Sequence, residues 1–184
     1  MIKKYTYGNP FFTESVVASF EASEGMPEVG TVNLDDGFSF LYDMKAEDAV
    51  YGLGEANRGI NKRGYKYISN NTDIPNHHED VYSLYASHNF VIISGERTFG
   101  LYIDYPSSLV FDIGYELHIF CDKADLDLYV ITGESIYDIV KQFRQMIGKS
   151  YIAPKFAFGF GQSRWGYKTP EDFAYVVKKY RENH

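Results

Sequence analysis

The stretch Leu126-Asp127-Leu128-Tyr129-Val130-Ile131-Thr132-Gly133, together with the residues that follow it, decides the fold class. Its apolar positions Leu126, Leu128 and Val130 alternate with their neighbours, which is the two-residue period of a β-strand. After Gly133 the apolar residues recur at the spacing of one helix face, at Ile136, Ile139, Val140, Phe143 and Ile147. Ser135 suits the N-cap and Gly148 suits the C′ position, so the sequence predicts a strand and then a helix over Ser135–Ile147.

Strand-like segments recur upstream of this point. Aromatic residues make up 17% of the chain, and such residues favour half-buried strands. Further predicted strands are Ser15–Glu21, Val29–Leu34, Phe38–Asp43, Tyr65–Ser69, Phe90–Ser94, Thr98–Asp104, Leu109–Ile113 and Glu116–Cys121. Many short strands separated by Gly and Asp clusters indicate an antiparallel sandwich or barrel. The polar stretch Asn70–Asp80 interrupts this rhythm, and a long polar insertion in a compact sandwich is often functional.

The last thirty residues or so have a different pattern. Alternating phenylalanines predict a strand over Lys155–Gln162, and Thr169 and Pro170 suit the start of a second helix. A strand followed by a helix is half of a βαβ unit, which cannot bury its own apolar face. We therefore expect the chain to be cut inside a second domain.

Composition excludes several classes of partner. The 184 residues carry a formal net charge of −7, which disfavours nucleic acid and anionic membrane surfaces. No apolar run approaches the roughly 20 residues of a membrane-spanning helix. The start Met1–Tyr5 is followed by no apolar stretch typical of a secretory signal, so we expect a cytoplasmic protein. The single Cys121 excludes an internal disulfide and a structural zinc site of the cysteine type.

Familiar chemical motifs are weak in this sequence. Gly52-x-Gly54 lacks the third glycine of a dinucleotide fingerprint, and a glycine turn or a close backbone approach explains it better. The adjacent His77 and His78 lack metal-ligand spacing and suit a solvated loop. We therefore expect no metal and no cofactor. Spacing alone nominates no pair of catalytic carboxylates.

The segment Gln162-Ser163-Arg164-Trp165-Gly166-Tyr167 is more informative. It follows a predicted strand and precedes a capped helix, where side chains face the mouth of a βα-repeat barrel. Two interpretations stay open. An indole beside an arginine suits a sugar-pocket wall, or else Trp165 caps a core and Arg164 pairs with a carboxylate.

Several motifs, taken in order, resemble glycoside hydrolase family 31, the retaining α-glucosidases and their relatives. The resembling pieces are Gly52-Leu53-Gly54-Glu55, Asn71-Thr72-Asp73, Phe99-Gly100-Leu101-Tyr102, Leu126–Gly133, Ala157-Phe158-Gly159, Gln162–Tyr167 and Tyr180-Arg181-Glu182. The resemblance implies a mainly β fold, with an antiparallel β-sandwich of the mutarotase-like superfold followed by the first strand–helix unit of a truncated (β/α)8 barrel. The implied domains are a sandwich over 1–133, a linker helix and connection over 134–154, and the start of the catalytic barrel over 155–184.

The resemblance also implies roles for single residues. Asp73 matches a loop aspartate that hydrogen-bonds the aglycone-side sugar, and Trp165 matches an aromatic wall of the glycone pocket. Thr72 and Arg164 are weaker candidates that support the site. In the other interpretation Asp73 is an Asx-turn residue. The nucleophile and the acid of the family lie downstream, so we expect no catalytic residue in this chain and no turnover by it.

The resulting hypothesis is the N-terminal part of a cytoplasmic α-glucosidase that removes terminal α-linked glucose from short oligosaccharides. Its partners are the α-glucoside substrate and the remainder of the catalytic barrel; the oligomeric state is open. Relatives with another glycone, such as α-xylosidases or α-galactosidases, remain alternatives. So do a non-catalytic carbohydrate-binding sandwich and a sandwich whose own pocket performs mutarotation. The last would need a histidine, such as His88 or His118, facing a carboxylate, and no spacing supports it.

Overall fold

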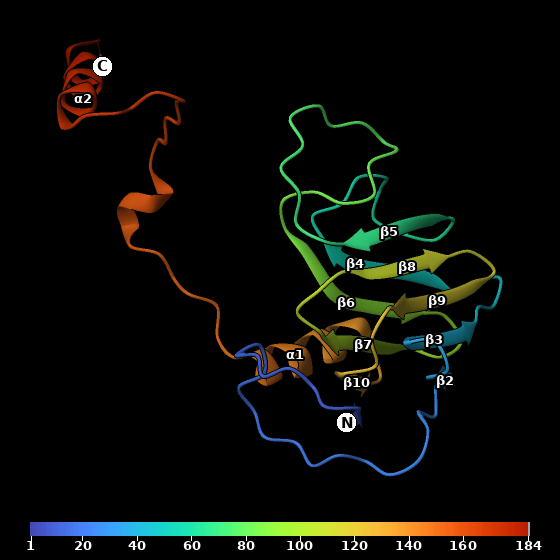
Figure 1. Ribbon diagram of the computed structural model, residues 1–184. Helices are drawn as coiled ribbons and strands as arrows, with labels where there is room; N and C mark the ends of the chain where they lie inside the picture. Colours follow the sequence, from blue (N-terminus) through green and yellow to red (C-terminus); the bar gives the residue numbers. More distant parts are fainter. Residues whose placement is uncertain (184) are drawn as a thin grey trace. The chain divides into compact units, whose positions relative to one another are not determined.

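The computed structural model describes residues 1–183 and forms two compact units, Met1–Lys149 and Ser150–His184, with His184 itself outside the described residues (Figure 1). The first unit contains two five-stranded antiparallel sheets whose apolar faces enclose one core. The predicted β-sandwich is therefore confirmed.

The strands of the first unit are distributed evenly between the sheets. In spatial order the first sheet contains β1 (Ile2–Tyr7), β10 (Leu126–Thr132), β7 (Phe99–Asp104), β6 (Ser87–Ser94) and β4 (Ala49–Gly54). In the same way the second sheet contains β2 (Thr31–Asn33), β3 (Phe38–Asp43), β9 (Glu116–Cys121), β8 (Leu109–Ile113) and β5 (Tyr65–Ser69).

Strand β10 explains why the deciding stretch is so apolar. Leu126, Leu128 and Val130 lie in the core between the sheets, as their alternation predicts. Tyr129 and Ile131 point to the opposite face and are buried in a second apolar cluster. A strand buried on both faces has few polar positions.

Helix α1 (Ile136–Ile147) covers that second face. Ser135 caps it, because the Ser135 hydroxyl accepts a hydrogen bond from the Asp138 backbone N–H at 3.2 Å. Its apolar stripe packs on the first sheet, where the Phe143 and Phe90 rings stack with their centroids 3.8 Å apart. The helix implied to be a linker thus packs against the sandwich, and the compact units divide after it, between Lys149 and Ser150.

In the first unit, one predicted strand is wrong, and two strands, β1 and β4, were not predicted. Ser15–Glu21 forms no strand, because the backbone N–H groups of Val17 and Ala18 donate instead to the Met146 carbonyl at the end of α1. Strand β1 lacks apolar alternation, and β4 contains Gly52 and Gly54. At Gly52 the backbone has φ +123°, and an added Cβ would meet the Phe90 carbonyl oxygen, so the predicted close backbone approach is confirmed.

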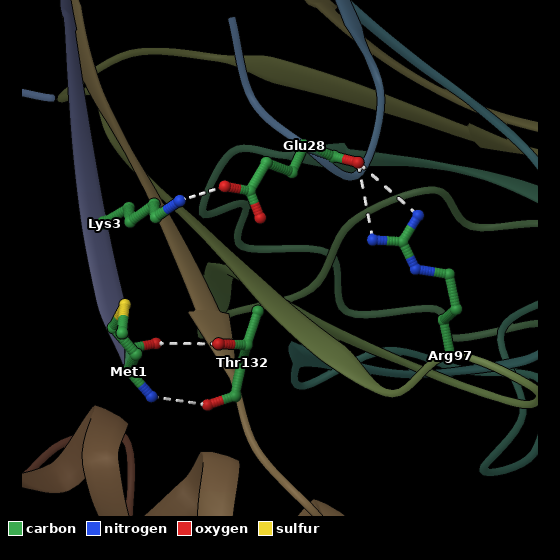
Figure 2. A network of polar contacts seen from close by, with 5 residues as sticks. All are labelled: Met1, Lys3, Glu28, Arg97 and Thr132. Atoms are coloured by element: carbon green, nitrogen blue, oxygen red, sulfur yellow. Dashed lines mark hydrogen bonds and ion pairs between the residues drawn. The ribbon is translucent and has the colours of Figure 1, made fainter. Parts of the chain in front are cut away.

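The start of the chain is anchored to the end of β10 (Figure 2). The Met1 amino group donates to the Thr132 carbonyl at 2.7 Å, and the Thr132 N–H donates to the Met1 carbonyl at 2.8 Å. Nearby, the Lys3 ammonium pairs with the Glu28 carboxylate, and the Arg97 guanidinium donates to the Glu28 carbonyl at 3.4 Å. These contacts hold both the first residue of the chain and the segment before β2.

The second unit contains the 3-10 helix η1 (Lys155–Phe158) and helix α2 (Pro170–Asn183). Residues 155–158 therefore differ from the expected strand. A strand needs a paired neighbour, and residues 150–183 supply none. The predicted start of α2 is confirmed, because the Thr169 hydroxyl accepts from the Asp172 N–H at 3.3 Å. Within residues 1–183, neither α1 nor α2 combines the length and the apolar character that crossing a membrane requires.

Candidate functional site

A polar loop over residues 70–86 joins the two sheets. It leaves the end of β5 in the second sheet and enters β6 in the first sheet. Its base is fixed by Asn71, whose side-chain oxygen accepts hydrogen bonds from the Ser87 N–H at 2.9 Å and the Ser87 hydroxyl at 2.8 Å. The polar stretch Asn70–Asp80 therefore belongs to the connection between the two sheets.

Thr72 holds the two arms of this loop together. Its backbone N–H donates to the Leu84 carbonyl at 2.9 Å, and its hydroxyl donates to the Ser83 carbonyl at 3.2 Å. The Thr72 side chain is half-buried by these contacts. This geometry fits a residue that supports the loop.

Asp73 follows directly and is exposed. The pKa of Tyr85 is raised, first by hydrogen bonding between its hydroxyl and the Asp73 carboxylate and then by desolvation of the hydroxyl. The same hydroxyl donates to the Ile74 carbonyl at 3.3 Å. The carboxylate is therefore presented to solvent beside an aromatic ring.

Arg58 fixes the far side of the loop, and sequence reasoning did not identify it. The Arg58 Nε donates to the Glu79 carbonyl at 2.5 Å, and Nη1 donates to the Lys66 carbonyl at 3.2 Å. Its guanidinium carbon lies 4.6 Å from the centre of the Tyr65 ring and 5.6 Å from that of Tyr82. Asn57 adds a bond from its side-chain amide to the His78 carbonyl at 2.6 Å. The sequence shows Arg58 only as a charged residue that follows Gly52–Asn57. Its role could not be predicted, because the Glu79 and Lys66 carbonyls that it binds lie elsewhere in the sequence.

Trp165 lies in the second unit, between η1 and α2, and its side chain is fully exposed. The neighbouring segment is ordered on α2, since the Phe160 ring lies 5.2 Å from that of Tyr180 and the Tyr180 hydroxyl donates to Gln162 Oε1 at 2.7 Å. Arg164 lies over the Tyr167 ring, 5.9 Å from its centre. Within the described part of this unit, Trp165 caps no core and Arg164 has no carboxylate partner in an ion pair.

Within residues 1–183, the other candidate groups of the sequence, Cys121 and the adjacent histidines, do not form a reactive centre. Burial raises the pKa of the Cys121 thiol, which is the opposite of what a nucleophile needs. His77 packs edge-on against Tyr85 with the ring centres 5.5 Å apart. In residues 1–183, no three His, Cys, Asp or Glu side chains come together in a way that could hold a metal ion.

Comparison with known proteins places this geometry in a family. Residues 4–112 match the model of the glycosyl hydrolase 31 N-terminal galactose mutarotase-like domain. Alpha-glucosidase 2 of Bacillus thermoamyloliquefaciens is 28% identical over 144 residues, covering 76% of this chain and 18% of that protein. The alpha-glucosidase of Saccharolobus solfataricus is 23% identical over 180 residues, covering 93% of this chain and 26% of that protein.

The fold agrees with a solved structure. A GH31 dextranase of Flavobacterium johnsoniae, in complex with glucose, superposes with a TM-score of 0.74 at 23% identity, covering 82% of this chain and 19% of that one. The chain thus spans about a quarter or less of the length of these relatives. Since the family model covers more than half of the chain, the chain belongs to glycosyl hydrolase family 31 and contains the N-terminal galactose mutarotase-like domain of that family.

Proposed function

We propose that this chain is the N-terminal part of a retaining, cytoplasmic α-glucosidase that hydrolyses terminal α-linked glucose from short oligosaccharides. The observation that carries the proposal is the extent of the relationship. The Saccharolobus alpha-glucosidase matches 93% of the chain, which must include most of Ser150–His184 as well as the sandwich. In the proposal, residues 155–184 begin the (β/α)8 catalytic barrel, and the exposed aromatic side chains of this unit pack against the rest of it.

Asp73 is proposed to hydrogen-bond the substrate on its aglycone side. An exposed carboxylate accepts two sugar hydroxyls well, and charge-assisted hydrogen bonds are stronger than neutral ones. Support comes from the loop itself, which Thr72 ties at 2.9 Å to the Leu84 carbonyl and Arg58 ties at 2.5 Å to the Glu79 carbonyl. A carboxylate on an anchored loop loses less conformational entropy on binding than one on a free loop.

Trp165 is proposed to form an apolar wall of the glycone pocket, with Arg164 supporting it. An indole offers a flat apolar face to the C–H groups of a sugar ring. Its full exposure suits a side chain that a ligand or the remaining barrel covers. Retaining hydrolysis needs two carboxyl groups about 5–5.5 Å apart, and in the proposal both lie in the remainder of the barrel.

The test uses the longer reading frame of the parent protein with p-nitrophenyl α-glucoside, and p-nitrophenyl α-xyloside as the competing substrate. We expect Asp73→Ala and Trp165→Ala each to lower kcat/KM by about tenfold or more, through lost charged hydrogen bonds and lost ring contact. Asp112→Ala, on β8 of the second sheet, is the control and should leave kcat and KM unchanged.

Each possible failure addresses a different part of the proposal. A folded full-length protein that cleaves neither glycoside contradicts the glycosidase assignment, and faster cleavage of the xyloside contradicts the glucose preference. Wild-type constants in both variants contradict the two site assignments. Turnover by the 184-residue chain alone would show that the reactive carboxylates are wrongly placed. A reading frame that ends at His184 would favour a carbohydrate-binding module.

A further inference from the structure

A second polar site lies in the sandwich, apart from Asp73. A hollow with a volume of about 450 Å³ opens where β5 ends, β6 begins and β7 ends, next to the segment before β2. Pockets for small molecules typically measure about 300–1,000 Å³. Neither Thr72 nor Asp73 lines it, although Asn71 at the base of the loop does.

The chemistry of the lining defines the class of ligand. Most of the lining residues carry hydroxyl or amide groups: Thr13, Ser15, Ser69, Ser87, Ser107, Asn70, Asn71 and Asn89. One carboxylate, that of Asp104, is among them, and none of the described lining residues is Lys or Arg. Such a surface offers many donors and acceptors to a polyhydroxylated molecule and no cation to a phosphate or a carboxylate.

The titratable groups of the hollow are arranged on one face of the first sheet. His88, Tyr102 and Asp104 follow the alternation of β6 and β7 onto the face that also carries Phe90. The His88 ring packs edge-on against Phe143 with the centres 5.7 Å apart, and desolvation lowers the pKa of His88, so the ring favours its neutral form. Partial burial raises the pKa of Asp104. Titratable side chains with shifted pKa values that gather in a hollow are typical of ligand-binding sites.

The lining is also pre-organised by its own hydrogen bonds. The Thr13 hydroxyl lies 2.8 Å from both carboxylate oxygens of Asp104, and holds that side chain from the segment before β2. The Asn89 side-chain amide donates to the Tyr105 carbonyl at 3.0 Å, while its oxygen accepts from the Ser69 hydroxyl. Because these polar side chains are already held in place, less conformational entropy is lost when a ligand binds.

We propose that this hollow binds a neutral sugar unit, with the Asp104 carboxylate accepting hydroxyl hydrogens and the surrounding amides and hydroxyls completing the site. It is a second carbohydrate site of the chain, which shares Asn70 and Asn71 at the base of the polar loop but does not include Asp73. The proposal does not depend on the glucosidase assignment, because it uses residues of the sandwich alone.

The test follows backbone amide signals of the 184-residue chain by NMR while glucose, methyl α-glucoside or isomaltose is added up to about 100 mM, in the weak millimolar range of affinity. We expect saturable shifts at Asn71 and Asn89. Asp104→Asn should weaken binding by about tenfold, as the loss of a charged hydrogen bond implies. Ser107→Trp, an exposed position on the rim, should fill the hollow and abolish the shifts without touching the core.

Three controls separate this site from others. Asp112→Asn removes an exposed carboxylate from the second sheet and should change nothing. Asp73→Ala should keep the response; if it removes the response, the sugar binds at the loop and the proposal is wrong. Glucose 6-phosphate should bind more weakly than glucose, and tighter binding would contradict a site without cations.

Two further outcomes would overturn the proposal. One is the absence of saturable shifts with every neutral sugar, and the other is equal shifts in wild type, Asp104→Asn and Ser107→Trp.

Discussion

Single residues hold the functional loop in place, and Arg58 is the clearest case. It adopts a left-handed backbone with φ +69°, which non-glycine residues rarely do. Its guanidinium bonds two carbonyls and faces three tyrosine rings, those of Tyr65, Tyr67 and Tyr82. A strained residue kept in such a setting indicates that the surrounding contacts compensate for the strain.

Arg58→Lys tests this anchoring. Lysine keeps the charge and loses the planar fork that reaches two carbonyls at once. We expect amides over residues 70–86 to exchange hydrogen about tenfold faster, while global stability changes by less than about 1 kcal/mol. Hydrogen exchange read by mass spectrometry measures the first quantity and urea unfolding the second. Arg144→Lys, on α1, is the matched control; equal effects of both variants would contradict the role of Arg58.

Cys121 provides a pH-dependent test at the same scale. Burial raises the pKa of its thiol in the folded chain above that of the unfolded chain. The folded state therefore binds this proton more tightly, so the contribution to stability is present below the unfolded pKa and is lost as pH rises through the folded pKa. We expect a thiol reagent at pH 8 to label Cys121 slowly until urea unfolds the protein. Labelling at the rate of a free cysteine in the folded protein would contradict this.

Among the elements, the sequence predicts the bounds and caps of α1 well, but it does not predict the surface on which α1 packs. The caps Ser135 and Gly148 are local features, and both are confirmed. The surface that the helix covers depends on contacts far away in sequence, such as the 3.8 Å stack of Phe143 on Phe90. Gly100 allows this approach, because a Cβ there would meet Ile139 Cγ2 at 2.7 Å.

Phe143→Ala should lower the free energy of unfolding by about 3–5 kcal/mol, since it removes a buried ring from the second cluster and leaves a cavity. Tyr137→Ala on the same helix is the control, with a side chain that is 78% exposed and an expected change within about 0.5 kcal/mol. Urea unfolding followed by circular dichroism gives both values. A small effect of Phe143→Ala would mean that α1 contributes little to the sandwich.

The strands show why sequence reasoning succeeded where it did. β3, β5, β8 and β9 alternate clearly, because one face meets the core and the other meets solvent, and all four were predicted. β1 was not, since its positions are mostly half-buried and its lysines belong to ion pairs such as Lys4 with Asp127 at 2.8 Å. The polar loop was identified from composition, whereas the hollow with His88 and Asp104 was not, because it is assembled across β6 and β7.

At the scale of the whole molecule, the two units differ in what they bury. The buried apolar side chains all lie between Tyr5 and Met146, and among the described residues from 150 on there is no buried side chain. α2 has an apolar stripe and a good cap, but a helix of this length is marginal in water without tertiary packing.

Removing residues 150–184 should therefore leave the urea midpoint of the remaining chain unchanged, because the complete core stays. A second truncation, which removes residues 134–184, deletes α1 as well. It should have a clearly lower urea midpoint, since the second cluster loses Ile139, Phe143 and Met146. Circular dichroism at matched concentration measures both. A large loss of stability in the first truncation would show that the second unit supports the sandwich.

The pairing of Met1 with Thr132 also has a consequence for biosynthesis. β1 neighbours β10, and β10 lies between β1 and β7 in the first sheet. Translation therefore completes β1 well before its partner β10, and contacts so distant in sequence form slowly. Until β10 has emerged, β1 carries unpaired N–H and C=O groups along its length, and chaperones have reason to shield such an edge in a nascent chain.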